Sequence, residues 1–396
     1  MTDSLLKELA SSLGTPSYVY DEDVFLQRVQ LVKKEFGNKV GICFSIKANP
    51  FLLGSLPECF NKIEVCSPGE LTICEKTNTD MKKIIFSGVN KTMPDVERAM
   101  DDGVGTFTAE SLMHVDLINQ SACKRNIRVP VLLRLTGGSQ FGMDEADLLN
   151  IIKNRDDYKG IEIVGIHYFT GTQKRKPAAI VKELDLVEQF AEKVKSELDF
   201  EIKRVEYGTG LAVDYFNAEA DALEAERLKG VSEKIRELGE KVELTIEMGR
   251  FFAAPCGYYF TKVIDVKTNC GINYAICDGG LNQLKYDGQI QGMQIPVITH
   301  LKADENTKSG EEQPWTLCGS LCTTADVLAR NVSFNALEQN DILVFHRTGA
   351  YSVMEGMAVF LSREMPKIAL YSQKDGLRVI RDFICSDKFN TPDLNI

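Results

Sequence analysis

The sequence predicts an α/β protein, with a (β/α)8 barrel of the TIM type followed by a smaller domain that is mostly β. Eight short apolar runs alternate with helical patterns from Val40 to about residue 250, and eight is the number of strands in such a barrel. After Phe252 the pattern changes to β-prone runs separated by glycine-rich and polar turns. With 396 residues, the chain is long enough for two domains of ordinary size.

The runs of the predicted barrel are short and almost continuously apolar, as is typical of parallel strands that are buried on both faces. They lie near residues 42–46, 62–66, 83–87, 104–108, 129–135, 162–168, 202–206 and 242–247. The alternative is an open, doubly wound sheet. A glycine-rich phosphate loop after the first strand would favour that sheet, and the sequence has none there.

The segments between these runs carry apolar residues at helical spacing. In the first helical segment the apolar face comprises Phe25, Val29, Val32 and Phe36. The longest helical pattern extends from residue 180 to residue 198. Ser67-Pro68-Gly69-Glu70 has the sequence of a capping box with proline at the first helical position, and it therefore predicts the start of a helix.

These patterns indicate two domains. We expect the barrel to comprise residues 22–252. The β-rich domain is expected to comprise residues 253–396, together with an N-terminal strand within residues 1–21. Its clearest β runs are Pro16–Tyr20, Gly257–Thr268, Tyr274–Cys277, Trp315–Cys318 and Asp341–Phe345.

Composition excludes several classes of function. The formal net charge of −11 disfavours nucleic acid and anionic membranes as partners, because both need a basic face. No apolar run is long enough to span a membrane, and the N-terminus lacks the pattern of a signal peptide, so a cytoplasmic location is expected. The 11 cysteines and 4 histidines show no metal-ligand spacing, and no metal site is expected.

A lysine follows the first apolar run of the barrel. Val40–Phe44 has the pattern of a buried strand, Lys47 lies just beyond it, and Asn49-Pro50 ends the segment. A lysine at the mouth of a buried strand is a candidate for Schiff-base chemistry, because a desolvated ammonium loses its proton easily and the free amine attacks carbonyl carbons. The alternative is a lysine whose charged end extends into water. In a barrel, the groups that carry chemistry lie just past the carboxyl ends of the strands, where Lys47 falls.

Two glycine turns and a carboxylate follow the last two predicted strands. Gly208-Thr209-Gly210 and Gly249-Arg250 could offer backbone N–H groups and a cation to a phosphate, which commonly binds near these strands, although plain turns are the alternative. Glu247 could hold a pyridinium N–H through a charge-assisted hydrogen bond, or it could pair with Arg250. A Schiff-base lysine, a phosphate cradle and such a carboxylate together predict pyridoxal 5'-phosphate (PLP) as the cofactor.

The chain resembles the fold-type III PLP-dependent decarboxylases, the diaminopimelate and ornithine decarboxylase group, whose barrel is related to that of alanine racemase. The matching stretches occur in the same order over nearly the whole chain. They are Tyr18–Asp21, Ser45–Asn49, Glu64–Glu70, Ile85–Gly88, Phe141–Gly142, Gly165–His167, Gly171–Gln173, Glu247–Arg250, Gly319–Cys322 and Gly349–Tyr351.

The resemblance implies a role for each matched residue. Lys47 would carry PLP, Glu247 would hold its ring nitrogen, and Glu64 would lie near its hydroxyl group. The residues at or near its phosphate would be Thr172, Gly208, Gly210, Gly249, Arg250 and Tyr351. Cys322 would donate a proton to the substrate carbon from the partner subunit of a homodimer with shared active sites; the alternative is a buried thiol without a catalytic role.

Three positions depart from the pattern of this family. Phe169 stands where the family has a histidine that stacks on PLP, and we expect the phenylalanine ring to stack there, with His167 in a supporting structural role. Thr323 follows Cys322 at a position where decarboxylases of free diamino acids have Asp or Glu to bind the distal ammonium. Lys285 lies in the region of the Arg-Pro carboxylate clamp of diaminopimelate decarboxylases. Thr323 and Lys285 are therefore predicted to bind a different substrate.

The sequence thus predicts a PLP-dependent carboxy-lyase that acts on an α-amino carboxylate. Gln140–Glu145, Thr170–Gln173 and Leu321–Thr323 resemble a narrower branch that decarboxylates conjugated or carrier-bound amino acids in natural-product pathways. The expected substrate is of that kind, either a small molecule or an amino acid tethered to a carrier protein. The alternatives are a decarboxylase of free diamino acids, a PLP-dependent racemase and a PLP-binding protein without activity.

Overall fold

The computed structural model describes residues 1–304 and 310–393 of the chain. The chain divides into two compact units. The barrel unit comprises residues 28–213 and 221–251, and the β unit comprises residues 1–27, 214–220 and the chain from residue 252 onward. The segments 22–27 and 214–220 group with the β unit although both lie within the predicted barrel range, and the predicted domain limits themselves stay a prediction.

The barrel unit contains a closed barrel of parallel strands, which confirms the predicted fold class. Its strands are β2 (Gly41–Ser45), β3 (Phe60–Val65), β4 (Ile84–Phe86), β5 (Thr106–Ala109), β6 (Val129–Leu135), β7 (Ile161–Tyr168), β8 (Arg204–Gly208) and β9 (Glu243–Met248). Each strand pairs in parallel with the next one along the chain, and β9 closes the barrel by pairing with β2. This closure places the carboxyl ends of all these strands at one mouth.

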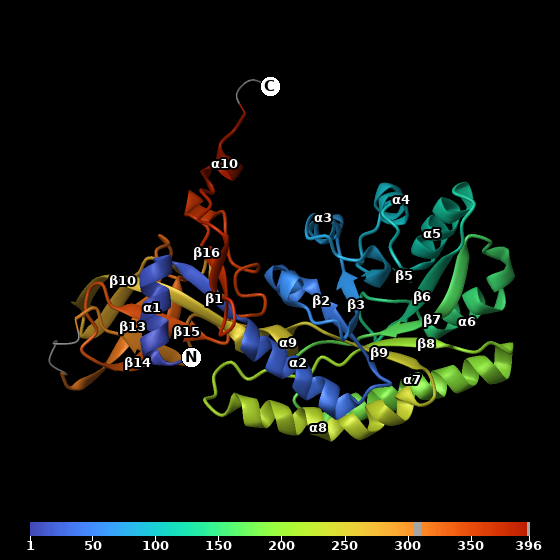
Figure 1. The fold of residues 1–396 in the computed structure, drawn as a ribbon, viewed down its shortest axis with the longest axis horizontal. Coiled ribbons are helices and arrows are strands. Elements are labelled where there is room, and N and C mark those ends of the chain that lie inside the picture. Colours follow the sequence, from blue (N-terminus) through green and yellow to red (C-terminus); the bar gives the residue numbers. More distant parts are fainter. Residues whose placement is uncertain (305–309, 394–396) are drawn as a thin grey trace. The chain divides into compact units, whose positions relative to one another are not determined.

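Helices alternate with the strands and surround the barrel (Figure 1). They are α2 (Glu22–Phe36), α3 (Pro68–Lys76), α4 (Met93–Asp101), α5 (Leu112–Lys124), α6 (Glu145–Lys153), α7 (Pro177–Leu198) and α8 (Ala220–Gly239). The apolar face predicted for α2 is buried, as are Ile180, Leu184 and Val187 of α7. Short 3-10 helices, η1 (Ile46–Ala48) and η2 (Pro50–Ser55), follow β2 and carry the predicted lysine segment.

The β unit is built on a mixed sheet of nine strands. The main path through the sheet is β14 (Val327–Asn335), β13 (Glu312–Cys318), β11 (Ile272–Cys277), β10 (Gly257–Asn269), β1 (Ser17–Asp21), β16 (Lys367–Ser372) and β17 (Gly376–Arg381). Beside this path, β15 (Ile342–His346) pairs with both β10 and β12 (Ile298–Leu301). The long β10 therefore organises the sheet, because three strands pair with it.

The β unit also contains a helix that the sequence reasoning missed. Helix α1 (Asp3–Leu13) begins after Thr2, whose side chain accepts a hydrogen bond from the backbone N–H of Leu5. Its buried leucines pack on apolar residues of β1, β10, β12, β15 and β16. The spacing of Leu6, Leu9 and Leu13 is the i, i+3, i+7 signal of such a helix, and it precedes the strand that was predicted.

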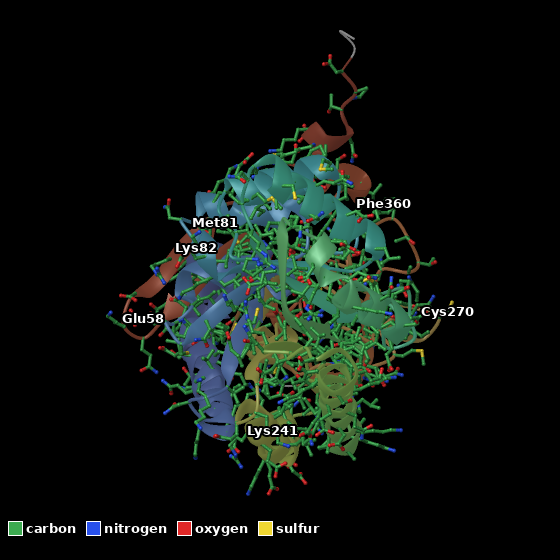
Figure 2. All side chains as sticks on the ribbon, turned by 90° about the vertical axis from the view of Figure 1, so that its right-hand side faces the viewer. Glu58, Met81, Lys82, Lys241, Cys270 and Phe360 are labelled. Carbon is green, nitrogen blue, oxygen red and sulfur yellow. The ribbon has the colours of Figure 1, made fainter. Side chains whose placement is uncertain are left out.

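Exposed apolar side chains gather in one segment of the β unit. Met354, Met357, Val359, Phe360 and Leu361 each expose more than a third of their surface. Figure 2 shows Phe360 at the surface of the molecule. Monomeric proteins seldom leave so many apolar side chains together in water, so this segment is a candidate contact surface.

None of the helices formed by residues 1–304 and 310–393 has the length and apolar character required to cross a bilayer.

Candidate active site

Lys47 lies on η1, immediately past the carboxyl end of β2. Ile46 and Ala48 on either side of it are fully buried, and they fix the backbone of this short helix. Asn49 then accepts a hydrogen bond from the backbone N–H of Phe51 and so caps η2. The Lys47 side chain itself keeps 35 % of its surface exposed, so a rigid backbone presents an accessible amine.

The amine of Lys47 lies beside two buried carboxylates from neighbouring strands. Its Nζ is 2.6 Å from Oε2 of Glu64 at the end of β3 and 3.7 Å from Oε1 of Glu247 at the end of β9. β3 and β9 are the two strands that pair with β2, so the closure of the barrel brings these three residues together. The sequence reasoning singled out all three, and the structure places them in contact.

The two carboxylates have pKa values shifted in opposite directions. Burial raises the pKa of Glu64, and the charge of Glu247 adds to this effect, while Lys47 opposes it. Burial alone would also raise the pKa of Glu247, but the charge of Lys47 and the hydrogen bond from His167 outweigh it, so its pKa lies well below the usual range. Glu247 is therefore the fixed anion of the site, and Glu64 is the group that can take up a proton.

Ser45 and His167 hold the carboxylate of Glu247. The Ser45 hydroxyl donates to Oε1 of Glu247 at 3.0 Å, and Nε2 of His167 lies 3.0 Å from Oε2. Both residues point into the barrel, where they and Glu247 are buried. The sequence reasoning assigned His167 only a supporting role without naming its partner, and it missed Ser45. Ser45 lies two residues before Lys47, on a strand that pairs with β9, and this position is the signal that could have identified it.

Cys66 is another member of the site that the sequence reasoning did not single out. Its thiol donates to Oε1 of Glu64 at 3.1 Å, and Nζ of Lys47 lies 3.5 Å from its sulfur. Burial and the charge of Glu64 raise the pKa of this thiol well above its usual value, so it stays protonated. Cys66 lies two residues after Glu64, just past the end of β3, and its thiol reaches the carboxylate of Glu64 from there.

The predicted capping box after β3 is only half confirmed. The Ser67 hydroxyl accepts from the backbone N–H of Glu70 and caps α3, as predicted. The carboxylate of Glu70 accepts from the backbone N–H of Cys66 at 2.6 Å, one residue before the N-cap. This hydrogen bond fixes the backbone of Cys66 next to Lys47, so the helix start also positions part of the site.

The glycines at the mouth of the barrel allow turns to approach each other closely. A Cβ atom at Gly208 would lie 2.5 Å from the ring of Phe169, and one at Gly249 would lie 2.7 Å from Cβ of Ala48. Gly210 has a φ of +59°, and a Cβ atom there would lie 2.0 Å from the carbonyl oxygen of Gly171. These contacts account for glycine at each position, and the predicted role of these turns in phosphate binding stays a prediction. The same is true of Thr172, which follows Gly171 in the facing turn.

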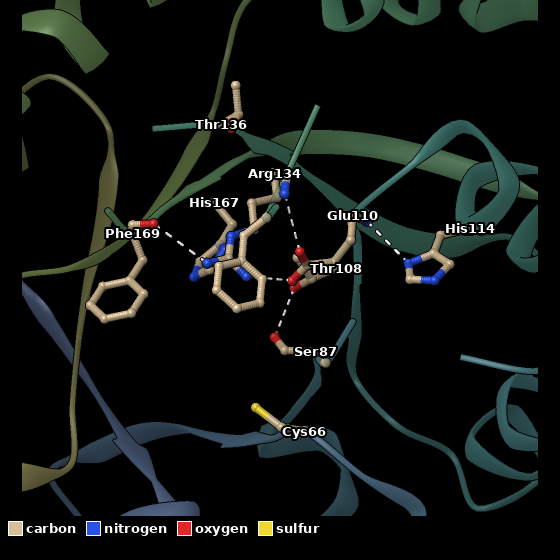
Figure 3. A network of polar contacts seen from close by, with 12 residues as sticks. Cys66, Ser87, Thr108, Glu110, His114, Arg134, Thr136, His167 and Phe169 are labelled. Carbon is tan, nitrogen blue, oxygen red and sulfur yellow. Dashed lines mark hydrogen bonds and ion pairs between the residues drawn. The ribbon is translucent and has the colours of Figure 1, made fainter. Parts of the chain in front are cut away.

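Figure 3 shows a polar network that fixes the strand ends on the far side of this mouth. The guanidinium of Arg134 at the end of β6 pairs with the buried carboxylate of Glu110, and its Nη2 donates to the backbone oxygen of Phe169 at 3.4 Å. The guanidinium also lies 4.9 Å from the centre of the Phe141 ring. The other oxygen of Glu110 accepts from the backbone N–H of Gly142 at 3.3 Å. This network positions Phe169, and the sequence reasoning missed Arg134.

A second lysine, Lys91, lies at this end of the barrel, and its side chain is buried. Lys91 follows β4, is 3 % exposed, and donates to the carbonyl oxygen of Gly88. Burial lowers the pKa of Lys91 to about 8, although the charge of Glu110 raises it. Lys91 is therefore a second candidate nucleophile by its pKa, but its amine is enclosed whereas that of Lys47 is accessible.

Arg250 follows Gly249 in the barrel unit, and the remaining predicted site residues belong to the β unit. Cys322 is exposed in the loop after β13, and Asp326 fixes this loop by accepting from the backbone N–H groups of Leu321 and Leu281, each at 2.8 Å. Thr323 follows Cys322, and its hydroxyl accepts from the backbone N–H of Ala325 at 3.3 Å. The carboxylate of Asp326 thus holds Cys322 and Thr323 on a fixed loop.

Lys285 and Tyr351 also lie in the β unit. The amine of Lys285 is 3.2 Å from the carboxylate of Glu355. Tyr351 has a φ of +64°, in the left-handed region that a tyrosine rarely adopts, directly after Gly349-Ala350. Such backbone strain is common at functional sites, which favours the predicted role of Tyr351 without assigning it a ligand.

The residues at the mouth fit PLP by their chemistry. An accessible amine suits an aldehyde, a carboxylate that stays ionised suits a protonated ring nitrogen, and an aromatic side chain suits the face of the ring. Lys47, Glu247 and Phe169 supply these three groups at the ends of β2, β9 and β7.

Comparison with known proteins defines the class. Residues 22–254 match the model of a family described as "Pyridoxal-dependent decarboxylase, pyridoxal binding domain". The chain belongs to this family. It is therefore an enzyme, a PLP-dependent decarboxylase, as the sequence reasoning predicted.

Individual relatives are similar over most of their length. The chain is 27 % identical over 370 residues to a diaminopimelate decarboxylase of Aquifex aeolicus (strain VF5), a match that covers 87 % of this chain and 84 % of the relative. It is 26 % identical over 399 residues to the L-glutamyl-(BtrI acyl-carrier protein) decarboxylase of Niallia circulans. This match covers 94 % of this chain and 92 % of the relative. A solved structure of diaminopimelate decarboxylase from M. jannaschii with L-lysine shares the fold, with a TM-score of 0.84 and 24 % sequence identity. The match covers 98 % of this chain and 94 % of the solved chain.

Proposed function

We propose that this enzyme decarboxylates an α-amino carboxylate that is conjugated, bound to a carrier protein or otherwise modified, in a natural-product pathway. The observation that carries this proposal is the absence of net charge at the two positions that the sequence reasoning assigned to substrate. Thr323 has no charge, and Lys285 is neutralised by Glu355 at 3.2 Å. A distal ammonium or carboxylate would have to leave water without an opposite charge to receive it, which is costly. A substrate with an uncharged extension avoids this cost.

A pocket in the β unit supports an extended substrate. It has a volume of about 240 Å³, and its walls include Leu281, Leu284, Val327 and Leu328. Lys285 and Glu355 also line it. Since one water molecule occupies roughly 30 Å³, such a volume has room for a chain of several heavy atoms. The pocket lies close to the loop of Cys322, because its lining residue Val327 follows Asp326 and its lining residue Leu281 donates a hydrogen bond to the Asp326 carboxylate.

The relatives are compatible with this proposal. Two of the similar curated proteins differ in substrate by name, one being a decarboxylase of diaminopimelate and the other of a glutamyl group on an acyl-carrier protein. The second has the wider coverage of this chain, 94 % against 87 %. A carrier-bound or conjugated substrate therefore lies within the range of this family. Decarboxylation of free diaminopimelate, lysine or ornithine is the alternative.

The residues at the barrel mouth would divide the work between them. PLP, bound through its aldehyde to Lys47, would supply the electron sink that makes loss of CO₂ from an amino acid possible. Glu247, held by Ser45 and His167, would keep the ring nitrogen protonated. Phe169 would cover one face of the ring and exclude water from it. The phosphate would lie at the glycine turns and Arg250.

Two groups would move protons. Oε2 of Glu64 is 2.6 Å from Nζ of Lys47, and its raised pKa suits it to take a proton from this nitrogen and return it. The thiol of Cys322 would donate its proton to the substrate Cα after CO₂ has left. The exposed position of Cys322 on its fixed loop supports this role, since a donor that acts on another subunit's substrate must be accessible.

We propose a homodimer as the active form. The apolar segment from Met354 to Leu361 supports this assembly, because pairing with a second copy would remove it from water. The segment follows Tyr351 in the chain, so an interface there would lie next to a predicted PLP ligand. The predicted cytoplasmic location also stays a prediction.

A substrate panel tests the proposal. Purified enzyme with PLP is offered free diaminopimelate, lysine, ornithine and glutamate, the same amino acids as amides, and glutamate loaded on a carrier protein. We expect CO₂ release and the matching mass loss from amide-linked or carrier-loaded substrates. Efficient decarboxylation of free diaminopimelate would contradict the proposal. Loss of optical activity without CO₂ release would instead show a racemase.

A further inference from the structure

Two buried polar side chains beneath Glu247 lack hydrogen bonds that their burial calls for. Glu206 on β8 is 2 % exposed. Among the described residues, neither of its carboxylate oxygens has a hydrogen bond of good geometry. The Cys43 thiol lies beside this carboxylate and is only a weak hydrogen-bond donor. His167 on β7 is also 2 % exposed, and its Nδ1 has no hydrogen-bond partner in the described part of the chain. Buried polar atoms are nearly always satisfied, so a pair of unsatisfied groups needs an explanation.

The two unsatisfied groups lie side by side. His167 and Glu206 are direct partners in the parallel pairing of β7 with β8, so their side chains leave the sheet on the same face. That face is the inside of the barrel, because Nε2 of His167 reaches Oε2 of Glu247 there at 3.0 Å. Gly208, two residues after Glu206, pairs with Glu247, so Glu206 lies one layer deeper in the barrel.

The hydrogen bond at one ring nitrogen of His167 determines what the other nitrogen needs. Glu247 stays ionised and can only accept, so Nε2 of His167 must carry the hydrogen between them. In a neutral imidazole, Nδ1 is then an acceptor and requires a donor. A protonated carboxyl group is such a donor, whereas an ionised one is not.

The charges that face Glu206 favour its protonated form. Burial raises its pKa well above the usual value, and Glu247 on β9 and Glu64 on β3 raise it further. Arg204 on its own strand lowers it, but not enough to reverse the shift. The other groups packed around it are the Cys43 thiol on β2, the Lys62 amine on β3 and the His167 ring on β7. Since two anions already stand above it, a third negative charge in this interior is unfavourable.

We propose that Glu206 is a positioning residue for decarboxylation, a neutral carboxylic acid that donates its proton in a hydrogen bond to Nδ1 of His167, directly or through one buried water molecule. The chain Glu206–His167–Glu247 then fixes the ring orientation and tautomer of the histidine. With its Nε2–H held on Glu247, the carboxylate cannot rotate away from the ring nitrogen of PLP. Carboxylic acid, imidazole and carboxylate thus form one buried row in which only the last group is charged.

This inference rests on the proposed role of Glu247, but its first test does not depend on that role. The protein is labelled with 15N-histidine, and the ring nitrogens of His167 are assigned by their loss in His167→Asn. We expect one protonated nitrogen and one unprotonated nitrogen that accepts a hydrogen bond, in protein with or without PLP. A doubly protonated ring at neutral pH would show an ionised Glu206 and overturn the proposal.

The second test uses variants of Glu206 with PLP bound. Glu206→Gln keeps a neutral donor of the same shape, and we expect its kcat within about threefold of wild type. Glu206→Leu removes the donor, and we expect kcat to fall by 10- to 100-fold with little change in KM, with a shift in the pH dependence of the absorbance of bound PLP. Cys43→Ala, which removes a buried neighbour of Glu206 without touching His167, is the matched control and should leave the pH dependence unchanged.

The outcomes separate the possible roles. Equal losses in Glu206→Gln and Glu206→Leu would show that an ionised carboxylate is required and would overturn the proposal. A Glu206→Leu enzyme with the wild-type kcat and spectrum would also overturn it. If Glu206→Leu does not fold, the glutamine variant and the histidine resonances still decide. If the pH dependence of the absorbance of bound PLP is the same in Glu247→Gln as in wild type, the proposed role of Glu247 is wrong. The NMR result on His167 would not be affected by that outcome.

Discussion

Nζ of Lys47, just past the end of β2, lies 2.6 Å from Oε2 of Glu64 on the neighbouring strand β3. The carboxylate is buried, whereas the lysine side chain keeps 35 % of its surface exposed. An amine that is paired on its inner side and open on its outer side can exchange a proton with the protein and still meet a ligand. This relationship separates Lys47 from Lys91, which is 3 % exposed, and leads to the first two predictions.

Lys47→Ala should abolish both PLP attachment and activity. Removing the amine removes the only covalent anchor that we propose, so we expect the visible absorbance of bound PLP to disappear and kcat to fall by at least about 10³-fold. Reduction of the wild-type holoenzyme with borohydride, followed by peptide mass mapping, should label Lys47. Labelling of Lys91 in its place would contradict the assignment, because burial lowers the pKa of Lys91 to about 8 and so makes it a competing amine at this mouth.

Glu64→Gln should slow the reaction without preventing PLP binding. The amide keeps the shape of the side chain but cannot take a proton from Nζ of Lys47, and loss of a general acid–base group typically costs about 10²- to 10⁴-fold in rate. The measurements are kcat and the absorbance titration with PLP. Glu58→Gln, a change at a residue shown at the surface in Figure 2, is the control. An unchanged kcat in Glu64→Gln would exclude a proton-transfer role.

The barrel and its catalytic mouth could be predicted because their signals are local. Strands buried on both faces give short apolar runs, and the residue that follows each run falls at the mouth whatever the packing of the barrel. Lys47 follows its run and Glu247 ends its run, whereas Glu64 lies within its run and was assigned only through the resemblance to the decarboxylase family. Their mutual contact then follows from the order of the strands, since β2 pairs with both β3 and β9.

The residues that support these three could not be predicted in the same way. The carboxylate partners of Ser45 and Arg134 lie 202 and 24 positions away in the chain, and no local pattern specifies them. A serine in a strand and a cysteine after one are common, and their roles depend on which side chain faces them inside the barrel. Helix α1 is a different case, because the helical spacing of its leucines is visible in the sequence, but only the strand that follows it was predicted.

Gly210→Ala should destabilise the protein more than an alanine at an open left-handed glycine. A Cβ atom at Gly210 would meet the carbonyl oxygen of Gly171 at 2.0 Å, in addition to the cost of a φ of +59°. Gly138→Ala is the matched control, with a φ of +88° and no atom within 4 Å of the new Cβ. We expect the control to lose about 1–2 kcal/mol of unfolding free energy and Gly210→Ala to lose more. Equal losses in urea unfolding would contradict the close approach of the two turns.

Stability should decrease as the pH falls from about 6.5 toward 4. Burial lowers the pKa of His114 from 6.5 to about 4, with the charge of Lys91 adding to it, and burial likewise lowers that of His346 to about 4. Each is neutral in the folded protein and protonated in the unfolded chain within this window, so the stability present above pH 6.5 is lost on acidification. The loss could reach roughly 3 kcal/mol per histidine.

Urea unfolding at pH 7.5 and pH 4.5 measures this loss. His114→Gln removes the titrating group from the barrel unit, and His346→Gln removes it from the β unit. Each variant should show a smaller difference between the two pH values than wild type. If the loss of unfolding free energy between pH 7.5 and pH 4.5 is as large in both variants as in wild type, other groups cause the acid sensitivity.

Thr323→Asp should create activity on free diamino acids. The new carboxylate would offer the distal ammonium of lysine or ornithine the opposite charge that Thr323 lacks, and a hydrogen bond to a charged group is worth about 1.5–3 kcal/mol. We therefore expect kcat/KM for these substrates to rise by roughly 10- to 100-fold, with no gain for norleucine, which has the same chain without the ammonium. Thr323→Asn, which has the shape of the aspartate without its charge, should gain nothing. A gain in both variants, or in neither, would place the substrate chain away from residue 323.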